Sequence, residues 1–227
     1  MLKKLTLKRG YKNIFKYLKK KTDVSFEFDR LNIIIGPNAS GKTSLLRLIK
    51  NGCENQKHYK KLELTTSVDM NDSSKLEFDK ITKAYRYDPT EHGNELAFDL
   101  QMQGTFDLFA ENWAYQHTLS GAEKHAKYHR RFLETHGQLK DEESVILFDE
   151  PETSNSINTL SYFVGGIEKI FLNKDNIQVF VSTHSPYLAL EFMNRGGKLI
   201  ELQQDYLKTQ IEEYRKLVKW YDLIYKE

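Results

Sequence analysis

The sequence has little cysteine and no long apolar run. One cysteine, Cys53, among 227 residues excludes a disulfide framework and a cysteine-rich zinc module, both of which need several thiols. No stretch approaches the roughly 18 to 20 consecutive apolar residues of a membrane span. The lysine-rich N-terminus lacks the apolar core of a secretory signal peptide. We therefore expect a cytoplasmic protein without membrane insertion.

An excess of charge of one sign is also absent. Lys and Arg number 34, Asp and Glu number 32, and the net charge of +2 predicts no polyanionic partner from bulk charge. Proline (4) and glycine (12) are sparse, and no repeat or linker divides the chain. Because 29% charged residues accompany 13 Phe and 13 Tyr, we expect a folded protein, with a single domain over residues 1–227.

Apolar patterning predicts an α/β fold. Residues 2–7 and 24–28 alternate between apolar and polar, which is typical of antiparallel strands with one solvent-exposed face. Residues 31–35, LNIII, are almost wholly apolar, as in a strand covered on both faces, and a glycine-containing loop and an apolar helix follow. Further strands are expected at 62–68, 96–102, 145–148, 177–181 and 199–202, and helices at 123–136, 160–172, 186–193 and 203–225. This alternation predicts a mostly parallel central sheet with an N-terminal antiparallel β subdomain.

The most specific motif is the loop after the first buried strand. Residues 36–43, GPNASGKT, match G-x-x-x-x-G-K-[ST], which a chain of this length contains by accident roughly once in a hundred. Such a loop curls backbone N–H groups around a β-phosphate, and the next helix points its positive end at the phosphates. We expect Lys42 to neutralise the β and γ oxygens of ATP and the Thr43 hydroxyl to ligate Mg²⁺. The predicted cofactor-binding residues are Gly36, Pro37, Asn38, Ala39, Ser40, Gly41, Lys42, Thr43 and Ser44.

Two adjacent carboxylates end a second buried strand. Asp149 and Glu150 follow VILF and precede Pro151. Neighbouring carboxylates repel each other unless a cation lies nearby, so Asp149 is predicted to hold Mg²⁺ through its water shell. Glu150 is then placed to polarise the attacking water. A plain strand-to-turn exit is the alternative, and the upstream phosphate loop argues against it.

These motifs resemble those of ABC-type ATPases. LSGAE at 119–123 resembles the family's LSGGQ signature, DEPE at 149–152 its Walker B motif, and VFVSTHSP at 179–186 its switch-histidine strand. With the loop at 36–43, four motifs occur in the family's order over about two-thirds of the chain.

The resemblance implies a P-loop NTPase fold: an ABC-ATPase head whose short helical subdomain, at about 105–140, carries the signature. It also implies an ATP-dependent homodimer. Ser120 and Gly121 of one subunit would complete the nucleotide site of the other, and His184 would act with Glu150 in catalysis by donating to the γ-phosphate. Taken alone, Ser120 and Glu123 form a helix capping box, and a strand-end histidine is more often structural.

Some positions depart from the family pattern. Ala122 replaces the second glycine of the signature, and TSNS at 153–156 lacks the residues that commonly contact the other subunit. The glutamine of the glutamine loop stays open between Gln101, Gln103 and residues 88–91. The candidates for an adenine-stacking aromatic are Tyr11, Phe15 and Tyr17.

The interval between Lys42 and Ser120 is too short for the coiled-coil arm of SMC proteins. Glu152 and the segment STHSP at 182–186 are most similar to RecF/SMC-like and overcoming-lysogenization-type ATPases. Those relatives work in DNA repair or phage defence, often beside a separate effector protein. The resemblance therefore implies an ATPase that drives or gates a partner. The alternatives are the nucleotide-binding subunit of a membrane transporter and an ATP-gated scaffold with little hydrolysis.

The two ends of the chain leave alternatives open. Nine Lys and Arg residues precede the first acid, Asp23, and this run could contact DNA phosphates or form a solvated or partner-binding face, which is the commoner fate. The amphipathic helix at 203–227 could dock a partner, although packing on its own domain is the commoner outcome.

Overall fold

The computed structural model describes residues 1–8, 23–56, 66–70, 74–80, 82–87, 143–153 and 157–225, together with Arg130 and Phe132. The strands are β1 (Leu2–Leu7), β2 (Val24–Glu27), β3 (Leu31–Ile35), β4 (Thr66–Met70), β5 (Ser74–Phe78), β6 (Lys83–Tyr87), β7 (Ser144–Asp149), β8 (Ile177–Thr183) and β9 (Lys198–Glu201). The helices are α1 (Lys42–Asn55), α5 (Ile157–Ile167), α6 (Pro186–Met193) and α7 (Tyr206–Tyr225), and the π-helical segment η2 (Glu168–Leu172) extends α5.

The described strands form two sheets. One has five strands in the order β6-β7-β8-β3-β9, and all its neighbouring pairs are parallel. The other has four antiparallel strands in the order β2-β1-β5-β4. The predicted α/β fold, with a parallel central sheet and an N-terminal antiparallel unit, is therefore confirmed.

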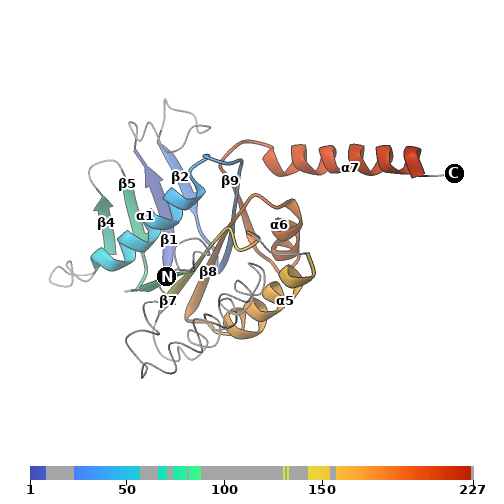
Figure 1. Ribbon diagram of the computed structural model, residues 1–227. Helices are drawn as coiled ribbons and strands as arrows, with labels where there is room; N and C mark the ends of the chain where they lie inside the picture. The colour runs from blue at the N-terminus through green and yellow to red at the C-terminus, as the bar shows by residue number, and fades with distance from the viewer. Residues whose placement is uncertain are drawn as a thin grey trace, which may run out of the picture.

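Both faces of the parallel sheet are covered, which explains why its strands are so apolar. Ile34 faces a core cluster that includes residues of α1 and of the antiparallel sheet. Its neighbours Ile33 and Ile35 face the opposite cluster, which includes residues of α5 and α6. Figure 1 shows α1 on one side of this sheet and α5 and α6 on the other. Successive side chains thus alternate between two apolar layers, as the period of a strand requires.

One buried amide joins the two sheets. Gln178 of β8 accepts a hydrogen bond from the backbone N–H of Leu2 at 3.0 Å and donates to the Leu2 carbonyl at 2.9 Å. The same side-chain nitrogen donates to the carbonyl of Asp29 at 2.7 Å. The Gln178 side chain therefore hydrogen-bonds three buried or partly buried backbone groups.

Several predicted elements have different bounds, and two strands were missed. The strand expected at 62–68 is β4, which begins at Thr66, and β5 and β6 were not predicted. The helix expected at 160–172 begins at Ile157, and its last five residues are π-helical. The strand at 96–102, the helix at 123–136 and the helical subdomain at 105–140 lie outside the described residues, except for Arg130 and Phe132.

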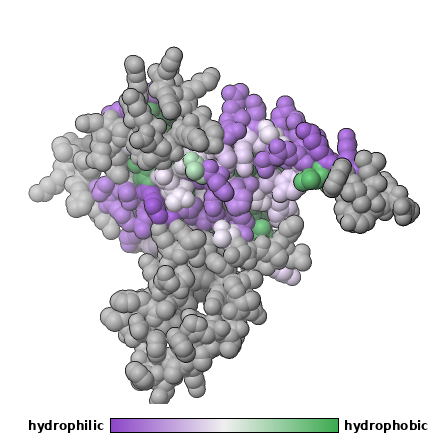
Figure 2. All heavy atoms as spheres, turned by 45° about the horizontal axis from the view of Figure 1, so that its top comes forward, coloured by the Kyte–Doolittle hydropathy of each residue, from purple (hydrophilic) through white to green (hydrophobic). Residues whose placement is uncertain are grey.

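Helix α7 leaves the body of the protein, as Figure 1 shows. Leu207 near its start is buried, whereas Tyr214, Leu217 and Val218 are 55%, 60% and 60% exposed. Tyr206, Leu207 and Ile211 of α7 pack on the domain, and Figure 2 shows an apolar spot near the end of the helix's described surface. Within the described residues no helix has both the length and the apolar character needed to cross a membrane.

Replacing Gln178 with Leu should destabilise the protein by about 3 kcal/mol, because the buried N–H and carbonyl of Leu2 would lose this partner and the Asp29 carbonyl would keep its bond from Asn32 but lose the one from Gln178. Chemical denaturation measures the change. The control Gln204→Leu, at an exposed position, should change stability by less than about 0.5 kcal/mol. Equal effects of the two substitutions would contradict the role assigned to Gln178.

Candidate functional site

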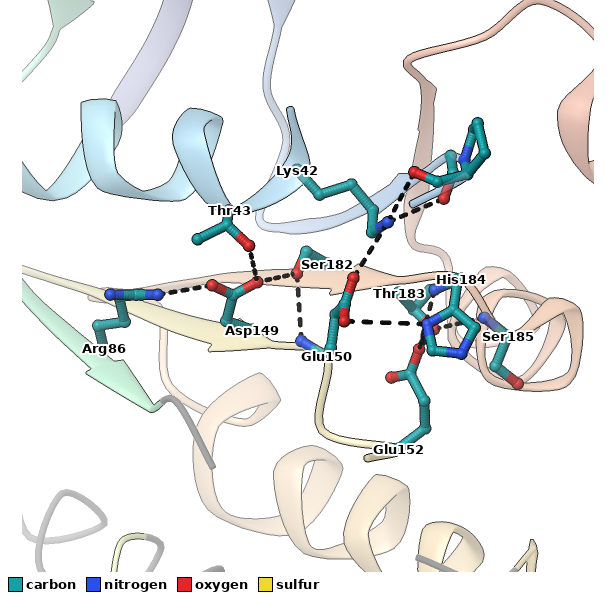
Figure 3. Close-up of polar contacts among 12 residues, drawn as sticks. Lys42, Thr43, Arg86, Asp149, Glu150, Glu152, Ser182, Thr183, His184 and Ser185 are labelled. Atoms are coloured by element: carbon teal, nitrogen blue, oxygen red, sulfur yellow. Dashed lines mark hydrogen bonds and ion pairs between the residues drawn. The ribbon is translucent and has the colours of Figure 1, made fainter. Parts of the chain in front are cut away.

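The candidate site lies at the carboxyl ends of β3, β7 and β8, where ligands bind in open parallel sheets. The phosphate loop follows β3 and His184 follows β8. Asp149 is the last residue of β7, and Glu150 comes directly after it. Figure 3 shows these side chains turned toward one another from three separate chain segments. The sheet order places β8 between β7 and β3, so the three strand ends are adjacent.

The loop at 36–43 has the backbone of a phosphate-binding turn. Ala39 and Gly41 have φ angles of 60° and 100°, in the left-handed region. A Cβ on Gly36 would lie 2.7 Å from the Ser40 hydroxyl oxygen and 3.2 Å from the Ser40 Cβ, so any larger residue would have to displace the Ser40 side chain. Gly41 caps α1 without a side-chain hydrogen bond, which leaves the first N–H groups of the helix to a ligand. The buried Ser40 hydroxyl also has no described partner.

Lys42 is folded back onto its own loop. Its ammonium group is buried and donates to the carbonyls of Gly36 and Pro37 at 2.9 and 3.1 Å. It also forms an ion pair with Glu150, with 3.0 Å between Nζ and Oε1. Three oxygen atoms thus take the place of water around this buried cation. Phosphate oxygens can make the same charge-assisted hydrogen bonds.

Asp149 is the most enclosed carboxylate of the site. Its Oδ1 accepts hydrogen bonds from the hydroxyls of Thr43 at 3.1 Å and Ser182 at 2.6 Å. Its Oδ2 accepts from Arg86 of β6 at 2.6 Å, and both side chains of this ion pair are at most 5% exposed. The carboxylate is therefore held from two sides.

Glu150 has a strained backbone and a partly exposed side chain. Its φ angle is 45°, an unusual value for a residue with a side chain. Its N–H donates to the carbonyl and hydroxyl oxygens of Ser182 at 3.0 and 3.2 Å, which fixes the turn. The side chain is 31% exposed, so a water molecule can reach it while Lys42 holds Oε1.

Glu152 is a buried acceptor for the segment after β8. Its Oε1 accepts from the Thr183 hydroxyl at 2.6 Å and from the His184 backbone N–H at 2.8 Å. The same oxygen lies 3.1 Å from Nδ1 of the His184 ring, which is 4.0 Å from Glu150. Glu152 therefore engages Nδ1 of the ring, and Nε2 is the nitrogen left for a ligand.

Tyr206, the first residue of α7, lies close enough to Glu150 and Glu152 for their charges to affect its phenol group. Burial, together with negative charges that include Glu213, Glu150 and Glu152, raises the pKa of Tyr206. Its phenol therefore stays protonated at neutral pH.

The described residues fit ATP and Mg²⁺. The lysine, the uncapped N-terminus of α1 and the unpartnered Ser40 hydroxyl suit phosphate oxygens. The Thr43 hydroxyl and the Asp149 carboxylate are the oxygen ligands that Mg²⁺ prefers. Among the described residues, no group of three His, Cys, Asp or Glu side chains could hold a metal. The metal would therefore depend on phosphate oxygens for much of its coordination.

The structure brings together most of the predicted site residues. Thr43 lies with Asp149, Lys42 with Glu150, and His184 beside Glu150. The residues from Gly36 to Ser44 form the loop and the start of α1. Ser120, Gly121, Gln101, Gln103, residues 88–91, Tyr11, Phe15 and Tyr17 lie outside the described residues.

Sequence reasoning missed three parts of the site: Arg86, Ser182 and the hydrogen bonds that Glu152 accepts from the segment after β8. Ser182 and Glu152 stood inside recognised motifs, so their hydrogen-bonding side chains could have been considered. Arg86 carried no local signal, because its position depends on β6 pairing with β7.

Fold and site together define a P-loop ATPase domain. The chain belongs to the AAA domain family, whose sequence profile matches residues 10–227. Proteins of this class generally bind ATP with Mg²⁺. Among curated proteins, none matches the sequence at a significant level.

Solved structures with a similar chain path include ATP-binding cassettes. A dimeric structure of MJ0796, described as a bacterial ABC transporter cassette, is 17% identical, covers 88% of this chain and 94% of its own, and has a TM-score of 0.47. MJ0796 has also been solved as a dimer bound to ADP and Pi, with 17% identity, the same coverage and a TM-score of 0.46. A protein of Streptococcus thermophilus is 11% identical, covers 87% of this chain and 74% of its own, and has a TM-score of 0.45.

The His184 ring should carry its proton on Nδ1 when the ring is neutral, because that nitrogen lies 3.1 Å from Glu152. The nitrogen chemical shifts of the ring, assigned with His184→Asn, measure the tautomer. In Glu152→Ala the preference should disappear. The control Glu191→Ala, in α6, should leave it unchanged, and an Nε2–H tautomer in the unmodified protein would contradict the arrangement.

Proposed function

We propose that this chain binds ATP with Mg²⁺ and hydrolyses it to ADP and phosphate. The observation that carries the proposal is that Lys42, Asp149 and Glu150 lie together at the carboxyl ends of the parallel strands. A phosphate-loop lysine, a metal-side aspartate and a carboxylate for the attacking water are the parts that phosphoryl transfer to water requires.

Each side chain has a separate task in the proposed reaction. Lys42 binds the β and γ oxygens, and Thr43 and Asp149 would hold Mg²⁺, which neutralises phosphate charge when it is bound. Glu150 orients the attacking water and accepts its proton. Because Glu152 holds Nδ1 of His184, Nε2 is the ring nitrogen that can donate to the γ-phosphate when the ring is protonated.

ATP must displace the contact between Lys42 and Glu150. In the structure these side chains neutralise each other at 3.0 Å. Phosphate oxygens that take over the lysine release Glu150 from this pair, so the carboxylate becomes free to act on water only after the nucleotide has bound. ATP binding and the activation of Glu150 are then the same event, in which Lys42 exchanges Glu150 for phosphate oxygens.

We further propose that the catalytic unit is an ATP-dependent homodimer of the RecF/SMC-like group. Ser120 and Gly121 of one copy would contact the γ-phosphate in the other, and opening after hydrolysis would drive or gate a separate effector protein. DNA, bound by the basic N-terminal run, is a further candidate partner. The 45%-exposed side chain of His184 supports closure by a second copy.

Two variants separate ATP binding from hydrolysis. Lys42→Ala should weaken ATP binding at least about tenfold, because it removes the ammonium group from the loop. Glu150→Gln should bind ATP more tightly than the unmodified protein, because it removes the pair with Lys42, and should hydrolyse it about 100-fold or more slowly. Equilibrium ATP binding and phosphate release measure the two effects.

The same measurements test the alternatives. An ATP-gated scaffold would dimerise with ATP while the unmodified protein released almost no phosphate. The subunit of a transporter would co-purify with a membrane protein and would not respond to DNA. Normal turnover by Glu150→Gln would show that another group acts as the base.

Ser120→Arg should leave ATP binding by the monomer intact and prevent the ATP-dependent dimer, because the long cation would occupy the place of the γ-phosphate contact. Light scattering of the variant combined with Glu150→Gln, in ATP, measures the dimer. The control Ser161→Arg, on α5, should still dimerise. Dimers of normal stability from Ser120→Arg would contradict the role of the signature.

A further inference from the structure

Arg86 reaches the metal side of the site from a strand that carries no recognised motif. It lies on β6, which pairs in parallel with β7 so that Arg86 faces Leu147 in register. Its guanidinium donates to Oδ2 of Asp149 at 2.6 Å. Figure 3 shows Arg86 and Ser182 on opposite sides of the carboxylate. Asp149 is therefore gripped at one oxygen by a cation and at the other by two hydroxyls.

Fold stability alone is a weak reason for this pair. Removing two charges from water costs as much free energy as their attraction returns, and apolar replacements of buried pairs are often equally stable. The Arg86 and Asp149 side chains are 5% and 4% exposed, so both bear that cost nearly in full. The position of the pair beside Thr43 suggests a role in the site itself.

We propose that Arg86 is a positioning residue that makes divalent metal binding depend on the nucleotide. It fixes Asp149 with Oδ1 toward Thr43, and it cancels the charge that would attract a metal ion to the nucleotide-free site. This inference rests on the proposed function, because it assigns the regulation of the same nucleotide site.

The charges of the described site explain the dependence. Without nucleotide, Arg86 balances Asp149, and Lys42 balances Glu150, so neither of these two carboxylates has an uncompensated charge for a divalent ion. The described residues also lack a group of three His, Cys, Asp or Glu ligands. ATP phosphates bring both the missing charge and the missing oxygen ligands, and only then does metal binding become favourable.

Manganese binding to the nucleotide-free protein tests the proposal directly, with Mn²⁺ as a paramagnetic probe for Mg²⁺. Free Mn²⁺ is measured by electron paramagnetic resonance during a titration. Arg86→Gln keeps a hydrogen-bond donor on the side chain but has no charge, and Arg86→Met removes both. We expect both variants to bind one Mn²⁺ at least about tenfold more tightly than the unmodified protein.

Lys83→Gln is the matched control, since it removes one positive charge from the same strand at an exposed position beside Ser144, away from Asp149. It should bind Mn²⁺ as weakly as the unmodified protein. Thermal unfolding gives a second measurement: Mg²⁺ without nucleotide should raise the melting temperature of Arg86→Met more than that of Lys83→Gln, because the ion replaces the lost guanidinium.

Equal Mn²⁺ affinity in Arg86→Gln and the unmodified protein would overturn the proposal. So would an Arg86→Gln protein that stays unfolded even with Mg²⁺, since the cation could then not be replaced by a metal ion. Failure of the unmodified protein to bind ATP would overturn the proposed function instead, and it would leave the difference in nucleotide-free Mn²⁺ binding intact. The two claims therefore fail separately.

Discussion

Three carboxylates close together at the end of one buried strand must each find a positive or donating partner, and the site is organised by that requirement. Like charges in a medium of low polarity repel strongly, and an unpaired buried charge is costly. Asp149 has Arg86, Glu150 has Lys42, and Glu152 has the His184 segment. The partners come from β6, from the loop after β3 and from the end of β8, so all three pairs depend on the parallel strand order.

The three pairs differ in how easily they can be exchanged. The pair of Glu150 and Lys42 is partly open, because Glu150 is 31% exposed, and phosphate can take the place of its carboxylate. The pair of Asp149 and Arg86 is nearly closed to solvent, so it persists while ligands change around it. The histidine ring is partly exposed and keeps one nitrogen on Glu152. A permanent pair, an exchangeable pair and a partly exposed histidine ring together make a site that can respond to a nucleotide without rebuilding its core.

The parts predicted from sequence are those whose signal is local. β3, β7 and β8 were recognisable because strands covered on both faces are apolar throughout, and the loop at 36–43 because its glycines and lysine have fixed spacing. β5 (SKLEF) and β6 (KAYRY) were missed because short strands with charged residues resemble loops. Arg86 could not be assigned, since its nearness to Asp149 follows from a pairing between strands far apart in the chain. The π-helical end of α5 likewise has no sequence rule that distinguishes it from an α-helix.

The place of β6 in the sheet gives Arg86 a second possible reason to be there, and the two reasons lead to different expectations. β6 is the edge strand of the described parallel sheet, and an inward-pointing charge on an edge strand opposes pairing with another chain. That explanation requires only a buried charge somewhere on β6. Edge protection does not require the Arg86 guanidinium to lie 2.6 Å from Oδ2 of Asp149, while Thr43 and Ser182 donate to Oδ1. The geometry at Asp149 therefore assigns Arg86 to the nucleotide site, and protection of the edge follows as a by-product of the same burial.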